Sequence, residues 1–128
     1  MAGVALAAFG CAALPGDSQA PLAASGDPAR GREVFVSREG GHCVLCHAVP
    51  GAAAAGNVGP PLAGVGARLD PAQIRFRVAD ITRLHPDAVM PAFHRTDGLS
   101  RVAPAAKGKP VLTAQQVEDV VAYLSGLR

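Results

Sequence analysis

Apolar residues recur at helical spacing in three stretches of the chain, and the first and last stretches are predicted to pair. The first begins at Asp27, which can cap a helix, and the proline that follows suits the first helical position. In this stretch Gly31 and Phe35 lie four residues apart, so a notch beside a large side chain lets a second helix approach closely. The last stretch begins at Thr113, which forms a capping box with Gln116. Its apolar face consists of Val117, Val120, Val121 and Leu124, with Tyr123 beside it.

A third helix is predicted between these two, beginning at Asp70 and Pro71. Its apolar stripe consists of Ile74, Val78 and Ile81. Its charged residues Arg75, Arg77 and Arg83 fall on other faces and are expected to be solvated. The sequence therefore predicts an all-α domain. With four Phe, one Tyr and no Trp, a small domain has few large side chains to fill a core, and a buried cofactor would supply the missing bulk.

The most informative motif is Cys-Val-Leu-Cys-His at residues 43–47. Two thiols three residues apart on one helical turn can each add to a vinyl group of the same porphyrin, which leaves the next imidazole beneath the iron. Cys43 and Cys46 are therefore predicted to tether one covalent haem c, with His47 as the proximal iron ligand. A redox disulfide would call for a βαβ pattern and a zinc site for a second ligand pair, and the sequence has neither.

Further haem contacts are predicted just downstream, in an extended Gly-Pro-Pro segment whose carbonyl groups are free to accept hydrogen bonds. A proximal imidazole normally gives its second N–H to such an acceptor, and the Pro60 carbonyl is the candidate. The alternative is a structural turn without haem contact. Leu62 is predicted to pack against the porphyrin. Arg68 either pairs with a haem propionate or faces water.

The second axial ligand is predicted to be Met90, the only methionine besides Met1. It lies next to Pro91 in a loop and outside any helical stripe, whereas a methionine that fills a core gap belongs to such a stripe. His85 and His94 are the rival sixth ligands.

The N-terminal segment is expected to direct export. Residues 4–14 form an Ala-rich apolar run of signal-peptide length that is too short to span a bilayer. Cleavage after Ala20 would give a signal peptide at residues 1–20 and a cytochrome domain at residues 21–128, located in the periplasm, since haem c is attached outside the cytoplasm. The alternative is a lipoprotein-like cleavage before Cys11, and membrane association is expected only if Cys11 is lipidated.

The charge pattern excludes one class of partner. The formal net charge of +2 is mild, and the basic residues are mostly dispersed arginines with little aromatic surface between them, so no nucleic-acid partner is expected. Neither a phosphate loop nor a catalytic triad nor paired carboxylates occur in the sequence.

Taken together, these features resemble a class I cytochrome c, which implies three to four helices wrapped around one covalent haem. Three segments further resemble SoxX, the monohaem cytochrome of the Sox thiosulfate-oxidising system. They are residues 57–62 (Asn-Val-Gly-Pro-Pro-Leu), residues 86–93 around Met90, and residues 112–124 of the last helix. The chain departs from that family at His85 and His94, where an amide and an aromatic residue are expected.

The resemblance implies an electron-transfer role in the periplasm. Members of that family pair with a second haem protein, SoxA, at whose haem thiosulfate is joined oxidatively to a cysteine of a carrier protein, while SoxX accepts the electrons and passes them to a downstream cytochrome. The chain would be the non-catalytic subunit of an L-cysteine S-thiosulfotransferase. Two alternatives stay open: a free-standing electron shuttle for an oxidase or dehydrogenase, and a haem enzyme or gas sensor in which Met90 leaves the iron.

Overall fold

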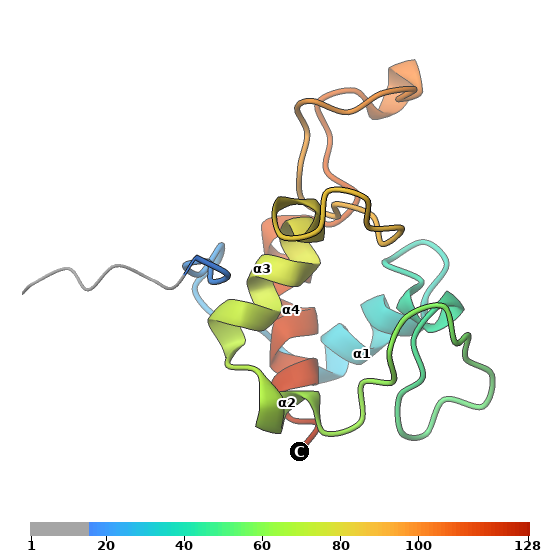
Figure 1. The fold of residues 1–128 in the computed structure, drawn as a ribbon, viewed down its shortest axis with the longest axis vertical. Coiled ribbons are helices and arrows are strands. Elements are labelled where there is room, and N and C mark those ends of the chain that lie inside the picture. Colours follow the sequence, from blue (N-terminus) through green and yellow to red (C-terminus); the bar gives the residue numbers. More distant parts are fainter. Residues whose placement is uncertain (1–15) are drawn as a thin grey trace, which may run out of the picture.

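The protein is described here by a computed structural model covering residues 16–128 (Figure 1), so the apolar run at 4–14 and Cys11 lie outside the described residues. Four α-helices form: α1 (Pro28–Val36), α2 (Val65–Arg68), α3 (Pro71–Asp80) and α4 (Ala114–Ser125). Single 3-10 turns occur at Cys43–Leu45, Ile81–Arg83 and Pro104–Ala106. Residues 16–128 contain no strand, and the predicted all-α class is confirmed.

The predicted helix starts are confirmed by their capping contacts. The Asp27 carboxylate accepts hydrogen bonds from the backbone amides at the start of α1, and a proline occupies the first turn. Helix α3 begins with a reciprocal capping box between Asp70 and Gln73, and α4 with one between Thr113 and Gln116. Local sequence therefore fixes where each of the three long helices begins.

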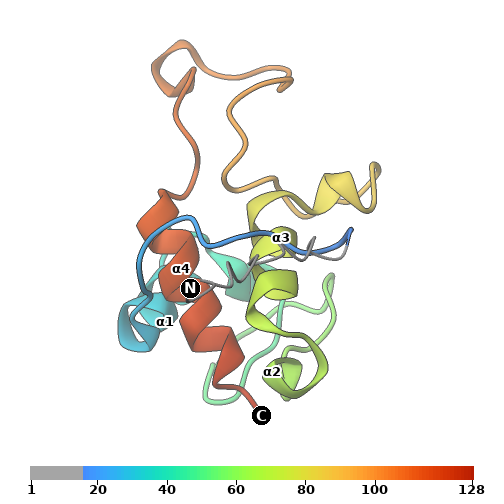
Figure 2. The same cartoon turned by 90° about the vertical axis from the view of Figure 1, so that its left-hand side faces the viewer.

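Helices α1 and α4 pack against each other as predicted, and Figures 1 and 2 show them crossing at the centre of the domain. Both Gly31 and Phe35 are buried, and the Phe35 ring meets the Tyr123 ring edge-on at a centroid distance of 5.6 Å. A Cβ atom added to Gly31 would overlap the backbone carbonyl of Asp119. The glycine is thus the notch that permits the close approach.

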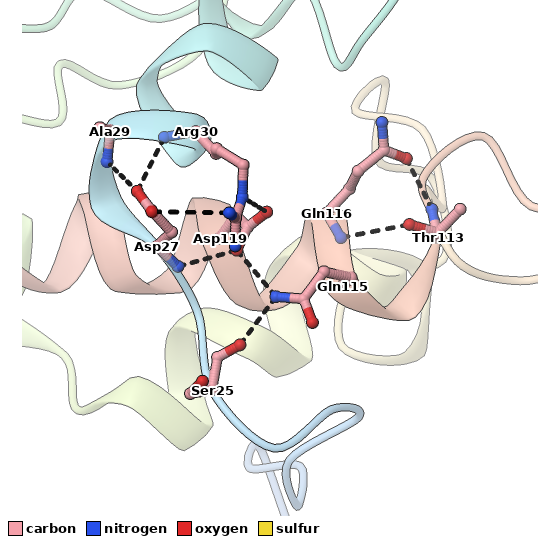
Figure 3. Close-up of polar contacts among 8 residues, drawn as sticks. All are labelled: Ser25, Asp27, Ala29, Arg30, Thr113, Gln115, Gln116 and Asp119. Carbon is pink, nitrogen blue, oxygen red and sulfur yellow. Dashed lines mark hydrogen bonds and ion pairs between the residues drawn. The ribbon is translucent and has the colours of Figure 1, made fainter.

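A polar network fastens the beginning of α1 to α4 (Figure 3). The buried Asp119 carboxylate accepts a hydrogen bond from the Asp27 amide at 2.8 Å and one from the Gln115 side chain at 2.9 Å. Arg30 Nε approaches its other oxygen at 3.3 Å. Burial alone would raise the pKa of Asp119, but these donors outweigh it and hold the pKa below its usual value. The carboxylate is therefore charged, and through the Asp27 amide and the Arg30 side chain it joins the two helices.

One continuous core is built around α4. The predicted apolar face of α4 is buried, and Ile74 and Val78 of α3 join it from the other side. Ile81 is only partly buried because α3 ends at Asp80 and the chain tightens into a 3-10 turn. The remaining buried apolar residues of the cluster are Phe35, Val49, Val65, Phe93 and Leu112.

The expectation that Arg75 is solvated is wrong. Its side chain is 6% exposed and forms an ion pair with the buried Glu118 of α4, with Nε and Oε1 2.6 Å apart. Burial alone would raise the pKa of Glu118, but hydrogen bonds from Arg75 and from the Leu22 amide outweigh it and hold the pKa below its usual value. Arg75 is buried because this charged partner, 43 residues away in sequence, lies opposite it in the fold.

The segment that precedes α1 lies across α3. The Gln19 amide donates to the Ala72 carbonyl at 3.0 Å, and the Gln19 carbonyl accepts from the buried Arg75 guanidinium at 2.9 Å. Asp17 forms an ion pair with Arg77 at 3.0 Å. Residues 17–22 are therefore hydrogen-bonded to the helical domain.

Candidate functional site

The Cys-Val-Leu-Cys-His motif forms one tight turn directly after α1. Residues Cys43–Leu45 are a 3-10 turn, preceded by His42 with a φ of 46°. The Cys46 and His47 amides both donate to the Cys43 carbonyl, at 3.1 and 2.9 Å. The turn is thus shorter than the helical turn expected from the sequence, because only His47 makes an α-type hydrogen bond before the chain leaves toward Pro50. Both thiols and the imidazole are nevertheless held on one turn.

The two cysteines have the chemistry of haem attachment rather than of a redox disulfide or a zinc site. Both are free thiols, and burial raises the pKa of the Cys43 thiol to about 12. Redox-active Cys-x-x-Cys pairs have depressed pKa values, because the thiolate is the reactive form. Among residues 16–128, no cluster of three or more His, Cys, Asp or Glu side chains could hold a metal ion.

The His47 ring is held by two neighbours from the downstream loop. Its Nδ1–H donates to the Pro60 carbonyl at 2.8 Å, so the predicted hydrogen bond is present. This bond leaves Nε2 unprotonated and available to bind iron. Gly59 packs flat against the ring, and a Cβ atom there would overlap it. Sequence reasoning missed this role of Gly59, although its place before Pro60 was the available signal.

Three backbone hydrogen bonds hold that loop to the motif. The amides of Gly56, Gly59 and Leu62 donate to carbonyls within residues 44–48, at 2.8, 2.9 and 2.8 Å. Leu62 is partly buried and packs against the core, and its contact with the porphyrin stays a prediction. The loop is therefore a fixed support for the His47 side of the site.

Arg68 is exposed at the end of α2, and its Nη1 donates to the Ala63 carbonyl at 2.7 Å. The guanidinium braces the turn that leads into α2, and pairing with a haem propionate stays a prediction.

The Met90 loop lies on the same side of α4 as the Cys-Val-Leu-Cys-His motif, as Figure 1 shows for the gold and the green segments. Met90 is partly buried against the core, and Phe93 just beyond it is buried. The rival ligand His94 is held by its Nδ1–H, which donates to the Leu112 carbonyl at 2.9 Å, and by its amide, which donates to the Ala79 carbonyl at 3.0 Å. The other rival, His85, is exposed. The His94 bond engages Nδ1 alone, as that of His47 does, so Met90 stays the sixth ligand predicted from the sequence, with His94 as its rival.

The residues present fit a covalently attached haem. Two free thiols, an imidazole whose Nδ1 is hydrogen-bonded and a glycine that clears its ring are gathered on one side of the helices.

Comparisons with known proteins agree with this site. The family model of cytochrome c matches residues 28–128, and the chain belongs to the cytochrome c family. It is similar to a chain in the crystal structure of SoxXA from P. pantotrophus, with 35% identity, a TM-score of 0.79, and coverage of 90% of this chain and 93% of that chain. No curated protein matches.

The protein is a class I cytochrome c that resembles SoxX, carries one covalent haem c and transfers electrons. No helix within residues 16–128 is long and apolar enough to cross a membrane.

Proposed function

We propose that this chain is the electron-accepting subunit of a SoxXA-like complex that oxidises thiosulfate. The observation that carries the proposal is the 35% identity, over 90% of the chain, to a chain of the SoxXA structure. The partner is a SoxA-like haem protein, at which thiosulfate is joined to a cysteine of the carrier protein. The electrons released pass to this chain and then to a downstream cytochrome. The chain is thus the non-catalytic subunit of an L-cysteine S-thiosulfotransferase.

The residues of the site support a role limited to electron transfer. The haem, when attached, supplies a one-electron acceptor. Cys43 and Cys46 tether it, and the Pro60 carbonyl orients His47 and increases the basicity of its ring. His47 and Met90 would hold the iron, substrate would then have no place on it, and electrons would be exchanged without substrate coordination. His/Met ligation also gives the haem a higher reduction potential than more strongly donating ligand sets do, which favours accepting electrons.

Exposed apolar side chains near the site support a permanent partner over a free shuttle. Leu45, between the two cysteines, is 63% exposed, and Val58, beside the glycine that contacts the His47 ring, is 70% exposed. Val89, next to Met90, is 81% exposed. Apolar residues exposed near a redox centre are typical of a surface that a partner covers, whereas a transient shuttle favours a ring of charge.

We also propose that the protein is exported to the periplasm and that its signal is cleaved upstream of Asp17, rather than after Ala20. Cleavage after Ala20 would remove the ion pair from Asp17 to Arg77 and would leave the buried Arg75 without the Gln19 carbonyl. The measurement is the N-terminal mass of the exported protein. A mature chain that contains Asp17 is expected, with or without a lipid on Cys11, and a chain beginning at Pro21 would contradict this boundary.

The complex is tested by expressing the tagged chain in its native periplasm, purifying it gently and staining a denaturing gel for covalent haem. A second haem band at fixed stoichiometry is expected, together with reduction of this chain by thiosulfate in the presence of the carrier protein. The matched control is the double variant Cys43→Ala/Cys46→Ala, which should lose the stain from this chain alone. A single small haem band that thiosulfate never reduces would sink the proposal and leave a free-standing shuttle.

A further inference from the structure

Residues 96–111 form a loop, here called the basic arm, that extends from the helices. Figures 1 and 2 both show it, in orange, reaching away from the helices at the end opposite the C-terminus. Its backbone hydrogen bonds are internal, as in those from Ala106 to Ala103 and from Lys109 to Ala106, and within residues 16–128 none joins it to a helix. The arm therefore contributes little to the stability of the helical fold.

The base of the arm is nevertheless fixed, and it is fixed to the Met90 loop. The Leu112 amide donates to the Phe93 carbonyl at 2.8 Å, and the His94 ring donates to the Leu112 carbonyl at 2.9 Å. Leu112 and Phe93 are both buried. Because Phe93 lies three residues beyond Met90, the arm leaves the domain beside the Met90 loop.

Within the arm, three cations surround a hollow of about 520 Å³. Arg101, Lys107 and Lys109 line it together with Leu99 and Val102, and no acidic side chain lines it. None of the three cations forms an ion pair with any residue in the described part of the chain. A hollow of this size accommodates several side chains, and its mixture of cations and apolar groups suits carboxylates carried on a peptide segment.

The backbone of the arm is strained in a way that packing does not explain. Arg101 has a φ of 57°, in the left-handed region that residues with a side chain rarely adopt. Gly98 and Gly108 nearby have φ values of 64° and 71°, which cost a glycine nothing. Such a strained residue on an exposed segment points to a functional constraint on where its side chain is presented.

We propose that the basic arm is a docking element that takes an acidic segment of the partner haem protein and so sets how the two haem sites face each other. This inference rests on the proposed function, since it assigns the occupant to that partner. Opposite charges across an interface fix the orientation of the partners and speed their encounter.

The test compares two variants of the haem-loaded protein with the same change in charge. Lys107→Glu/Lys109→Glu reverses two cations of the arm, and Arg32→Glu/Arg128→Glu reverses two exposed cations on α1 and at the C-terminus. Binding to the separately purified SoxA-like protein is measured by calorimetry at several salt concentrations. Haem absorbance and the denaturation midpoint are recorded for each variant and should match those of the wild type.

The arm variant is expected to bind roughly tenfold more weakly than the wild type at low salt, with a shallower salt dependence. The Arg32/Arg128 variant should bind like the wild type. Equal binding by the wild type and the arm variant would overturn the arm proposal and leave the proposed function intact. So would a loss of binding in the Arg32/Arg128 variant equal to that in the arm variant. If the wild type itself fails to bind the SoxA-like protein, the proposed function fails as well.

Discussion

Replacing Gly31 by alanine tests the close approach of α1 to α4 on which the haem-bearing loops depend. In an isolated helix this change would stabilise by roughly 1 kcal/mol, because glycine is a poor helix former. Here the new Cβ would overlap the Asp119 carbonyl and lie 2.9 Å from the Tyr123 Cβ. Since the nearest obstacle is backbone, no side-chain rotation relieves it, and α1 has to move away from α4.

The cost follows from the contacts that this movement weakens. A gap of about 0.5–1 Å forfeits roughly a quarter to a half of the dispersion energy across it. Truncating a buried Phe costs about 3–5 kcal/mol, so partial loss of the Phe35 contact costs about 1–2 kcal/mol. The hydrogen bond between the Asp27 amide and Asp119, worth about 1 kcal/mol, is stretched as well. After the gain in helix propensity, a net destabilisation of about 1–2 kcal/mol is expected.

The assay is urea unfolding of the haem-loaded protein followed by circular dichroism. Gly31→Ala should lower the midpoint by roughly 0.5–1 M. The matched control is Gly126→Ala at the end of α4, where φ is −79° and the nearest atom would lie at 3.4 Å, so stability should stay within about 0.5 kcal/mol of the wild type. A Gly31→Ala protein as stable as the wild type would refute the reasoning.

Two further predictions concern the buried ion pair and the His47 ring. Glu118→Gln leaves Arg75 without its charged partner and should destabilise by about 3–5 kcal/mol at neutral pH. Because folding lowers the pKa of Glu118, the stabilisation from its charged form is present above the usual value of 4.5 and is lost as pH falls through the pKa of the folded state. The unfolding midpoints of the wild type and Glu118→Gln, measured against pH, should therefore converge in acid. A constant gap between them would contradict this. Gly59→Ala should displace His47 from the Pro60 carbonyl. The imidazole then becomes a weaker electron donor to the iron, and the reduction potential of the haem should rise. A redox titration measures this, with Gly126→Ala as reference, and an unchanged potential would count against the prediction.

Features that depend on local sequence were predictable here. The capping residues mark where the long helices begin, and the Gly31 and Phe35 pair identifies the face of α1 that meets α4. The acceptor for His47 could be inferred because a Gly-Pro-Pro segment exposes its carbonyls, and the structure contains that hydrogen bond.

Features that depend on distant residues were not predictable. The spacing of apolar residues in α3 places Arg75 off the apolar stripe and so predicts that it is solvated. Only the fold shows Glu118 and the Gln19 carbonyl beside it. Likewise, the contacts of Asp17 with α3 could not be read from a segment whose composition resembles the end of an export signal. Periodicity reports which face of a helix is apolar, but it does not report which charge from another element lies opposite.

The measurement that most directly tests a closed electron-transfer haem is carbon monoxide binding to the reduced protein, monitored by absorbance, in the wild type and in Met90→Ala. If His47 and Met90 occupy both axial positions, the wild type should form no carbon monoxide adduct and Met90→Ala should form one readily. His85→Ala and His94→Ala serve as controls and should stay closed. A wild type that binds carbon monoxide, or a Met90→Ala protein that does not, would contradict His47/Met90 ligation and reopen the haem enzyme or gas sensor alternative.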